Sequence, residues 1–223
     1  MLKIIKTEDG SSSVYHEELN ETYHSTRGAL AESQHIYINA GLKYLLENGE
    51  KHIRIFEMGF GTGLNAILTY KEWLKYPEVI INYTAIEKYP LDELTVSQLV
   101  FEGISDNREI YEAFTLMHGL DWGQVVKLAE GFTFLKSEAD IHNYRHMDTY
   151  NLVYYDAFAP SKQPDVWKFE VLEKLSAALK PGAVLVTYCA GGQFKRDLKQ
   201  LDFDVQSLQG PAGKKEITRA VFI

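Results

Sequence analysis

The stretch RIFEMGFGTGLNAIL, residues 54–68, sets three glycines between two apolar runs. The run before Gly59 is β-branched and aromatic, which is typical of a buried strand, and the run after Gly63 has helical apolar spacing. Glycines at 59, 61 and 63 are too crowded for an ordinary turn, since each gives up side-chain packing and adds entropy to be lost on folding. The stretch therefore predicts a strand, a tight turn and a helix, with something that approaches the backbone at the turn.

Predicted strands and helices alternate along the rest of the chain. Strands are expected at 52–59, 79–90, 150–160 and 183–192, and helices at 29–48, 64–76, 91–103, 108–120, 166–182 and 193–203, with Pro-Gly ending the helix at 166–182. Residues 125–140 contain a central Glu-Gly that suggests a hairpin, and 205–210 and 216–223 are expected to be closing strands. The alternation predicts an α/β fold with a mainly parallel sheet, helices on both faces and an antiparallel C-terminal strand.

Length and composition fit one large domain. The chain has 223 residues, of which 45% are hydrophobic and 24% charged, and a polar, Tyr-rich lead-in (1–50) precedes the core (51–223). The lead-in either forms a lid, with Tyr23 and Glu32 as candidates, or packs on the sheet. One cysteine, Cys189, excludes an internal disulfide, and no signal peptide or membrane-spanning segment is visible, so a cytoplasmic protein without membrane contact is expected.

Charge is distributed unevenly along the chain. The formal charge is −8, with 13 Lys and Arg against 24 Asp and Glu up to Asp156, and 10 against 7 beyond it. Because local patches steer a polyanion more than the total charge does, the basic last third can dock RNA in an acidic protein. Ordinary scatter of surface charge is the alternative explanation.

The carboxyl ends of the predicted strands carry acidic residues. Glu57, Glu87, Asp140 and Asp156 lie at or just after the four strands expected to be neighbours. Ligands of open parallel sheets bind at this edge, near the point where the strand order reverses. The chemistry of the protein is therefore expected there.

The glycine turn distinguishes between two cofactors. A dinucleotide site uses G-x-G-x-x-G, whereas Gly63 arrives one place early here. Glu57 at the strand end would repel a pyrophosphate and attract a cation. S-adenosylmethionine, with its sulfonium and ammonium charges, fits better, and Glu87 and Asp140 would then bind the ribose hydroxyls and the adenine amine. The alternative is that the glycines only permit a tight turn.

DAFAPSKQPDVW, residues 156–167, is the second unusual stretch. Asp156 leaves the apolar run LVYY and enters a loop that Pro160 and Pro164 stiffen. Such a carboxylate can hold the N–H groups of an amine, accept the proton it loses and orient its attack on a methyl group. The alternative is that Asp156 caps amides of its own loop, and Phe158 and Trp167 are equally compatible with core packing.

These motifs carry a family resemblance. GFGTGLN (59–65), IEKYPL (86–91), DAFAPSKQPDVW (156–167) and GPAGKKE (210–216), with the upstream TYHSTRGALAESQHIYI (22–38), resemble the methyltransferase part of the MnmC-type tRNA wobble-uridine modification enzymes. The resemblance runs from about Leu19 to the end. It implies a Rossmann-like methyltransferase that uses S-adenosylmethionine to convert 5-aminomethyl-2-thiouridine of tRNA to 5-methylaminomethyl-2-thiouridine, leaving S-adenosylhomocysteine.

The resemblance also implies roles for residues. Asp156 would lie between methyl donor and substrate amine as the catalytic residue, and the implied cofactor-binding set is Glu57, Gly59, Gly61, Gly63, Asn65, Glu87, Lys88, Asp140 and Asp156. The candidate substrate-binding set is Phe158, Pro160, Lys162, Lys214 and Lys215. The FAD-dependent oxidase segment of the two-domain family members does not follow in this sequence, so a separate enzyme is expected to supply the aminomethyl uridine.

Other readings remain open. A small-molecule methyltransferase of the same fold is favoured by the negative charge, and it predicts that basic residues do not converge around the cleft. A binding module without catalysis predicts that Asp156 points away from the cofactor. His142 and His146 have i, i+4 spacing but no third ligand, so no metal site is expected, and Cys189 fits a core position.

Overall fold

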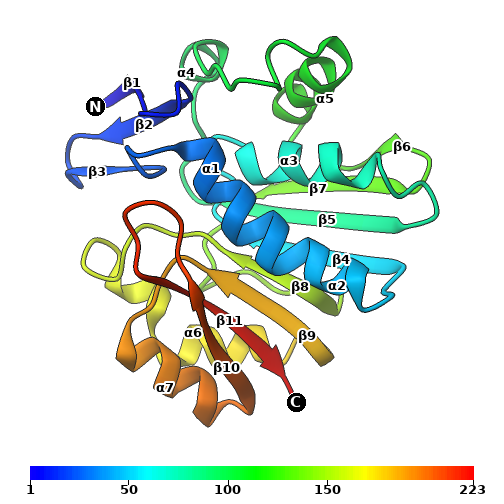
Figure 1. The fold of residues 1–223 in the computed structure, drawn as a ribbon, viewed down its shortest axis with the longest axis vertical. Coiled ribbons are helices and arrows are strands. Elements are labelled where there is room, and N and C mark those ends of the chain that lie inside the picture. The colour runs from blue at the N-terminus through cyan, green and yellow to red at the C-terminus, as the bar shows by residue number, and fades with distance from the viewer.

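The computed structural model describes residues 1–223 and is built on an eight-stranded sheet with the order β10-β11-β9-β8-β4-β5-β7-β6 (Figure 1). Five neighbouring strands are parallel: β4 (His52–Met58), β5 (Ile80–Glu87), β7 (Phe132–Glu138), β8 (Tyr150–Tyr155) and β9 (Leu179–Thr187). Antiparallel strands β6 (Val125–Ala129), β10 (Phe203–Gln209) and β11 (Glu216–Phe222) complete the two edges. The predicted mainly parallel sheet with antiparallel C-terminal strands is confirmed.

Helices cover both faces of the sheet, each over its own apolar cluster. One face carries α1 (Ala29–Ser33), the π-helix η1 (Gln34–Leu42), α2 (Lys43–Glu47), α3 (Leu64–Trp73) and α5 (Arg108–Gly119). The other carries the short 3₁₀ helix η2 (Pro164–Trp167), α6 (Phe169–Ser176) and α7 (Gly192–Gln200). In Figure 1 the run from α1 to α2 crosses the sheet diagonally, while α6 and α7 lie on the opposite side of β8 and β9. None of the helices has the length and apolar character needed to cross a membrane.

The lead-in contains a small sheet that the sequence did not reveal. Strands β1 (Leu2–Lys6), β2 (Ser12–His16) and β3 (Glu21–Thr22) form an antiparallel sheet beside α4 (Glu93–Ser97), as Figure 1 shows. Each of these strands is too short and too polar to give a clear alternating pattern. The predicted lead-in helix is present as the continuous run α1, η1 and α2.

Two predicted helices are shorter than expected. The helix expected at 91–103 is reduced to α4, and the helix expected at 166–182 ends at Ser176. Pro181 and Gly182 lie inside β9, where the register with β8 shifts and Gly182 has φ of +81°. Pro-Gly therefore forms an irregularity in a strand, which such residues commonly do, and the helix ends before it.

Candidate cofactor and active site

A cleft of about 1020 Å³ opens at the carboxyl ends of β4, β5 and β8. Strand order reverses between β4 and β8, and ligands of open α/β sheets bind at this position. The cleft is lined by the glycine turn after β4, the segments after β5 and β7, the loop after β8, and parts of the lead-in. Of the predicted site residues, ten line it: Gly59, Gly61, Asn65, Glu87, Lys88, Asp140, Asp156, Phe158, Lys162 and Lys214.

The glycine turn is in close contact with the loop after β8 and with the end of β5. Gly59 has φ of +94°, and a Cβ there would lie 2.4 Å from the backbone oxygen of Asp156. The amides of Gly59 and Phe60 both donate to the carbonyl of Ile86 at 3.0 Å. Gly63 also has positive φ, but it packs against His118 and does not line the cleft. The space left by the missing side chain of Gly59 is therefore filled by the chain itself, because the loop after β8 packs against the glycine turn.

Glu57, predicted to be a cofactor-binding carboxylate at the strand end, lies beneath the glycine turn. It is fully buried under the turn, does not line the cleft, and neither carboxyl oxygen has a hydrogen-bond partner. Burial, together with the negative charge of Asp156, raises the pKa of Glu57 well above its ordinary value. The hydroxyl of Tyr83 and the side-chain oxygen of Asn65 are buried and unpaired as well. Burial next to the negative charge of Asp156 thus favours a neutral Glu57.

Glu87 lies where β5 meets the cleft. One of its carboxyl oxygens accepts from the Gly61 amide at 2.9 Å and the other from the Tyr89 amide at 2.9 Å. Burial raises the pKa of Glu87, while these backbone hydrogen bonds oppose the change. Glu87 lies at the end of β5 and keeps lone pairs free on both oxygens, so the predicted contact with ribose hydroxyls stays a prediction that this geometry allows.

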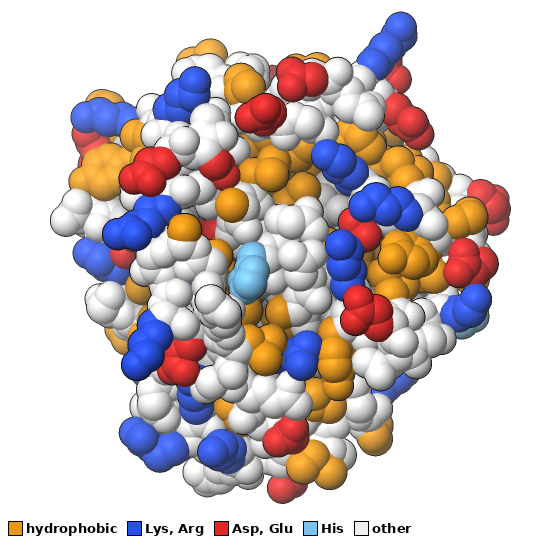
Figure 2. All heavy atoms as spheres, in the orientation of Figure 1, with side chains coloured by type: hydrophobic (Ala, Val, Ile, Leu, Met, Phe, Trp, Pro, Cys, Tyr) orange, Lys and Arg blue, Asp and Glu red, His pale blue; other side chains and the backbone are white.

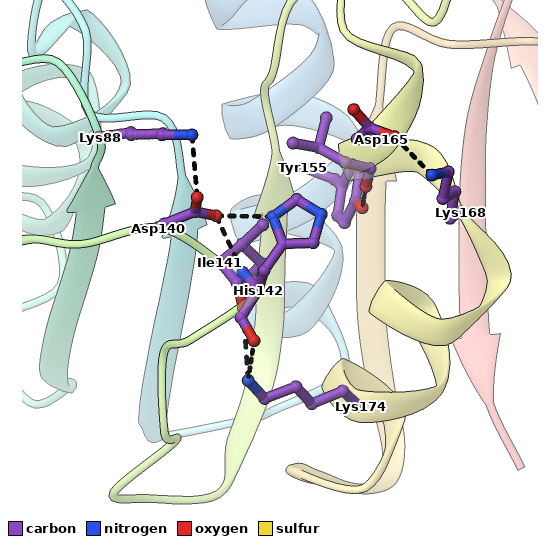
Figure 3. A network of polar contacts seen from close by, with 9 residues as sticks. Lys88, Asp140, Ile141, His142, Tyr155, Asp165, Lys168 and Lys174 are labelled. Carbon is purple, nitrogen blue, oxygen red and sulfur yellow. Dashed lines mark hydrogen bonds and ion pairs between the residues drawn. The ribbon is translucent and has the colours of Figure 1, made fainter.

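Asp140 is held in a network at the edge of the cleft (Figure 3). Lys88 forms an ion pair with one carboxyl oxygen at 2.9 Å, and the amide and ring nitrogen of His142 contact the other at 3.0 and 2.6 Å. Partial burial opposes ionisation of Asp140, but the hydrogen bonds from Lys88 and His142 outweigh it and hold the pKa well below its usual value. From α6, Lys174 donates to the carbonyl of His142 at 3.0 Å, which fixes the same segment. Lys88 therefore stabilises the ionised form of Asp140, and Asp140 remains a charged hydrogen-bond acceptor.

Asp156 lies directly after β8, at the base of the cleft. Its carboxylate accepts a 2.8 Å hydrogen bond from the side-chain amide of Asn65, and its own amide donates to Met58 at 3.1 Å. Burial raises the pKa of Asp156 to about 6, against a lowering by Tyr37 and Asn65. The side chain is thus turned toward the glycine turn and the cleft, and with a pKa of about 6 its carboxyl is mostly ionised at neutral pH.

The candidate substrate residues divide into two groups. Phe158 contacts Tyr23 of the lead-in edge to face, with ring centroids 5.0 Å apart, and both line the cleft with Lys162. Lys214 also lines the cleft, but it is paired with the buried Glu32. Pro160 and Lys215 are exposed outside the cleft, so the set predicted from sequence is only partly brought together.

Several cleft residues carried no interpretable signal in the sequence. Buried His24 of the lead-in contacts the hydroxyl of Thr62 in the glycine turn at 2.6 Å, and burial lowers the pKa of His24 to about 4. Tyr188 follows β9, donates to the carbonyl of Ala157 at 2.6 Å and lies under Lys214, whose Nζ is 4.1 Å from the ring centroid. A histidine or tyrosine in isolation has no spacing that marks it, so these contacts become visible only in the fold.

Comparisons with known proteins agree with this arrangement. Residues 133–222 match the model of a family described as S-adenosyl-L-methionine-dependent methyltransferases. The tRNA 5-methylaminomethyl-2-thiouridine biosynthesis bifunctional protein MnmC of Cupriavidus necator is 29% identical over 220 residues, which is 93% of this chain and 33% of that protein. The corresponding protein of Leptospira interrogans is 27% identical over 90% of this chain and 32% of its own length. The chain spans about a third of the length of these curated relatives.

Comparison with solved structures identifies the fold. The crystal structure of MnmC2 from Aquifex aeolicus has a TM-score of 0.83 and 26% identity, covering 99% of this chain and 70% of that one. TrmN from Thermus thermophilus, at 15% identity and a TM-score of 0.50 over 81% of this chain and 48% of that one, is similar in fold alone. Together, these similarities confirm the resemblance carried by the sequence motifs: the chain is similar to the methyltransferase part of the MnmC-type proteins and has the Rossmann-like fold of S-adenosylmethionine-dependent methyltransferases.

Proposed function

We propose that this protein transfers a methyl group from S-adenosylmethionine to the amine of 5-aminomethyl-2-thiouridine at the wobble position of tRNA. The single observation that carries the proposal is the placement of Asp156, whose carboxylate lies at the base of the cleft beside the glycine turn. The names of the relatives supply the substrate class, since MnmC proteins are named for tRNA 5-methylaminomethyl-2-thiouridine biosynthesis.

The residues of the cleft fit S-adenosylmethionine. Glu87 offers carboxylate lone pairs at the end of β5, Asp140 offers a charged acceptor for an adenine amine, and Gly59 and Gly61 line the cleft beside them. The unpaired side-chain oxygen of Asn65, which lines the cleft, offers an acceptor for an ammonium group or for water that bridges to it. When bound, this cofactor supplies a methyl group on a sulfonium sulfur, which keeps the electron pair of the broken S–C bond.

Asp156 is the proposed catalytic residue. Its carboxylate accepts hydrogen bonds from the substrate amine and so turns the nitrogen lone pair toward the methyl carbon. As the N–C bond forms, positive charge develops on the nitrogen, and the nearby carboxylate stabilises that charge. The amine then loses one proton to Asp156 or to solvent. A pKa of about 6 leaves the carboxylate mostly ionised above neutral pH.

The substrate base is proposed to enter between the lead-in and the loop after β8. Tyr23 and Phe158 form an aromatic wall on this side of the cleft. We propose that residues 1–50 act as a fixed lid over the core, because His24 and Glu32 connect the lead-in to the glycine turn and to Lys214. The whole chain would then work as one methyltransferase domain, supplied with the aminomethyl uridine by a separate enzyme.

The basic last third is proposed to contact RNA only at a few positions. Lys162 and Lys215 form no ion pair, whereas Lys195 is paired with Glu216 at 2.8 Å and Arg219 lies over the ring of Tyr44. On the face in Figure 2, Lys and Arg side chains alternate with Asp and Glu and do not form one continuous basic patch. Phosphate contacts are therefore assigned to Lys162 at the cleft and Lys215 on the β10–β11 loop.

The charge of the cleft supports a second candidate. Seven carboxylates line it (Glu18, Glu21, Glu32, Glu87, Asp140, Asp156 and Asp165) against three lysines (Lys88, Lys162 and Lys214). This excess of negative charge favours a small cationic amine as substrate. A small-molecule N-methyltransferase is thus the alternative, and it uses the same cofactor residues and the same Asp156.

Nucleoside analysis distinguishes the two functions. tRNA from a strain that lacks the gene is digested and its wobble nucleosides are measured by mass spectrometry, with complementation by the wild type and by Asp156→Ala. The tRNA function predicts that 5-aminomethyl-2-thiouridine accumulates, that the wild type restores the methylated nucleoside and that Asp156→Ala does not. Normal levels of the methylated nucleoside in the deletion strain would overturn the tRNA assignment and favour the small-molecule alternative.

A further inference from the structure

We infer that Tyr37 is a positioning residue for Asp156, and that its buried hydroxyl donates a hydrogen bond to the Asp156 carboxylate when that carboxylate is ionised. The inference deepens the proposed function, because it rests on the role given to Asp156. Tyr37 does not line the cleft, so it acts through Asp156 and does not touch the substrate.

The π-helix η1 brings Tyr37 to this position. Its residues Gln34–Leu42 form nine consecutive π-helical positions, whereas π turns in proteins are mostly single and occur often at functional sites. At Gly41 the helix approaches β8 and β9 so closely that a Cβ would lie 2.9 Å from a methyl carbon of Val186 and 3.3 Å from one of Leu152. This close contact seats the preceding turn, with Tyr37, against the carboxyl end of β8.

The side chain of Tyr37 packs against β8 and is close to Asp156. Its ring packs against that of Tyr154, with centroids 5.2 Å apart, and Asp156 follows two residues later. The side chain is 2% exposed, and its hydroxyl has no hydrogen-bond partner. A buried hydroxyl without a partner is costly, and the nearby Asp156 carboxylate is a strong acceptor for it.

The Tyr37 hydroxyl matters for the ionisation of Asp156 because of the other groups around this carboxyl. Charged and titratable groups near Asp156 come from every element around it: Glu32 of α1, Glu57 of β4, Tyr83 of β5, Tyr188 after β9 and Lys214 of the β10–β11 loop. The carboxylates among them disfavour ionisation of Asp156, and Lys214 is already paired with Glu32. The Asn65 amide and the Tyr37 hydroxyl are then the neutral donors available to favour the ionised form.

The test compares Tyr37→Phe with a matched control, Tyr154→Phe. Tyr154 is a fully buried neighbour whose hydroxyl contacts Thr69 at 3.1 Å and not Asp156. For both variants and the wild type, kcat/KM for methylation of aminomethyl tRNA is measured from about pH 5 to 9, and the affinity for S-adenosylhomocysteine is measured by calorimetry. Because Tyr37→Phe keeps the buried ring and removes only the hydroxyl, the variant is expected to fold.

Tyr37→Phe should move the acid limb of the pH profile upward by about one unit, with recovery at high pH and unchanged affinity for S-adenosylhomocysteine. Tyr154→Phe should keep the wild-type profile. A Tyr37→Phe profile that coincides with the wild type, or that falls equally at every pH, overturns the inference. If the wild type itself does not methylate tRNA, the proposed function fails, and the inference is then decided by NMR titration of the Asp156 carboxyl: an equal pKa in wild type and Tyr37→Phe contradicts it.

Discussion

The side-chain amide of Asn65 donates a 2.8 Å hydrogen bond to the carboxylate of Asp156, which connects the first turn of α3 to the loop after β8. Asn65 is 3% exposed and follows the glycine turn. The same hydrogen bond therefore links the segment assigned to the cofactor with the residue assigned to the substrate amine. Any displacement of the turn is transmitted to Asp156 through this contact.

Asn65→Ala should lower kcat/KM at neutral pH about tenfold, because the Asp156 carboxylate loses a donor that favours its ionised form. The loss should shrink as the pH rises above the pKa of Asp156. Asn82→Ala is the matched control, since Asn82 donates to Thr133 at 2.6 Å elsewhere in the sheet. A pH profile measured for both variants checks the prediction, and an Asn65→Ala defect that does not depend on pH would contradict it.

Gly59→Ala should be far more damaging than Gly49→Ala. Both glycines have positive φ, at +94° and +82°, so both substitutions strain the backbone by about 1 kcal/mol. Only at Gly59 does the new Cβ meet backbone, 2.4 Å from the oxygen of Asp156, while nothing lies within 4 Å at Gly49. Denaturant unfolding should show an additional loss of about 1–3 kcal/mol at Gly59, and calorimetry should show weakened binding of S-adenosylhomocysteine. Equal losses at the two sites would show that the close approach is absent in solution.

Asp156→Asn should change how the free energy of unfolding depends on pH. The pKa of Asp156 rises on folding from 3.8 to about 6, so the folded state prefers the protonated form. The contribution of this group to stability is complete below about pH 4 and is lost as the pH rises through 6. Relative to the wild type, Asp156→Asn should therefore gain about 1–3 kcal/mol between these pH values.

Urea unfolding of both proteins at several pH values measures this difference. The difference between wild type and Asp156→Asn is used because other groups also titrate. Burial lowers the pKa values of His24, His118 and His146 to about 4, and their contributions to the pH dependence of stability have the opposite sign. These contributions cancel in the difference. A difference that stays constant from pH 4 to about 7 would show that Asp156 has an ordinary pKa.

Substitutions of the neighbours Lys214 and Lys215 should have different effects, the first on stability and the second on RNA binding. Lys214→Met leaves the buried carboxylate of Glu32 without its ion pair and should cost about 1–2 kcal/mol, whereas the exposed Lys215→Met should change stability by less than about 0.5 kcal/mol. Lys215→Met should instead weaken tRNA binding and reduce its dependence on salt by about one phosphate contact. Unfolding curves and a salt series of binding constants check the pair. A salt dependence that is unchanged in Lys215→Met would remove this lysine from the RNA interface.

Much of the fold could be predicted from the sequence because its periodic segments are long. β4, β5, β8 and α3 combine clear apolar spacing with the glycine turn, and the structure has them where they were expected. The small lead-in sheet and the irregularity at Pro181 could not be predicted, since short polar strands and a Pro-Gly inside a strand are decided by tertiary pairing. Boundaries next to such residues depend on contacts that one sequence does not display.

The candidate site was predictable to the extent that it lies at strand ends. Glu87, Asp140 and Asp156 share one edge because the parallel strands before them do. Glu57 was expected to face a cation, but its direction depends on the alternation of side chains along β4, and burial beneath the turn favours its neutral form. Lys214 was expected to point to RNA, and its ion pair with Glu32, 182 residues away in sequence, could be seen only in the fold.

Methyl transfer by the purified protein tests the central claim most directly. Wild type and Asp156→Ala are incubated with S-adenosylmethionine and tRNA that carries 5-aminomethyl-2-thiouridine, and the digested nucleosides are analysed by mass spectrometry. Cofactor binding is measured separately by calorimetry. The account predicts that the wild type adds one methyl group to this nucleoside, and that Asp156→Ala binds the cofactor but is slower by about a hundredfold or more. A wild type that binds the cofactor and leaves the nucleoside unchanged, or an Asp156→Ala variant that methylates it at the wild-type rate, would contradict the account.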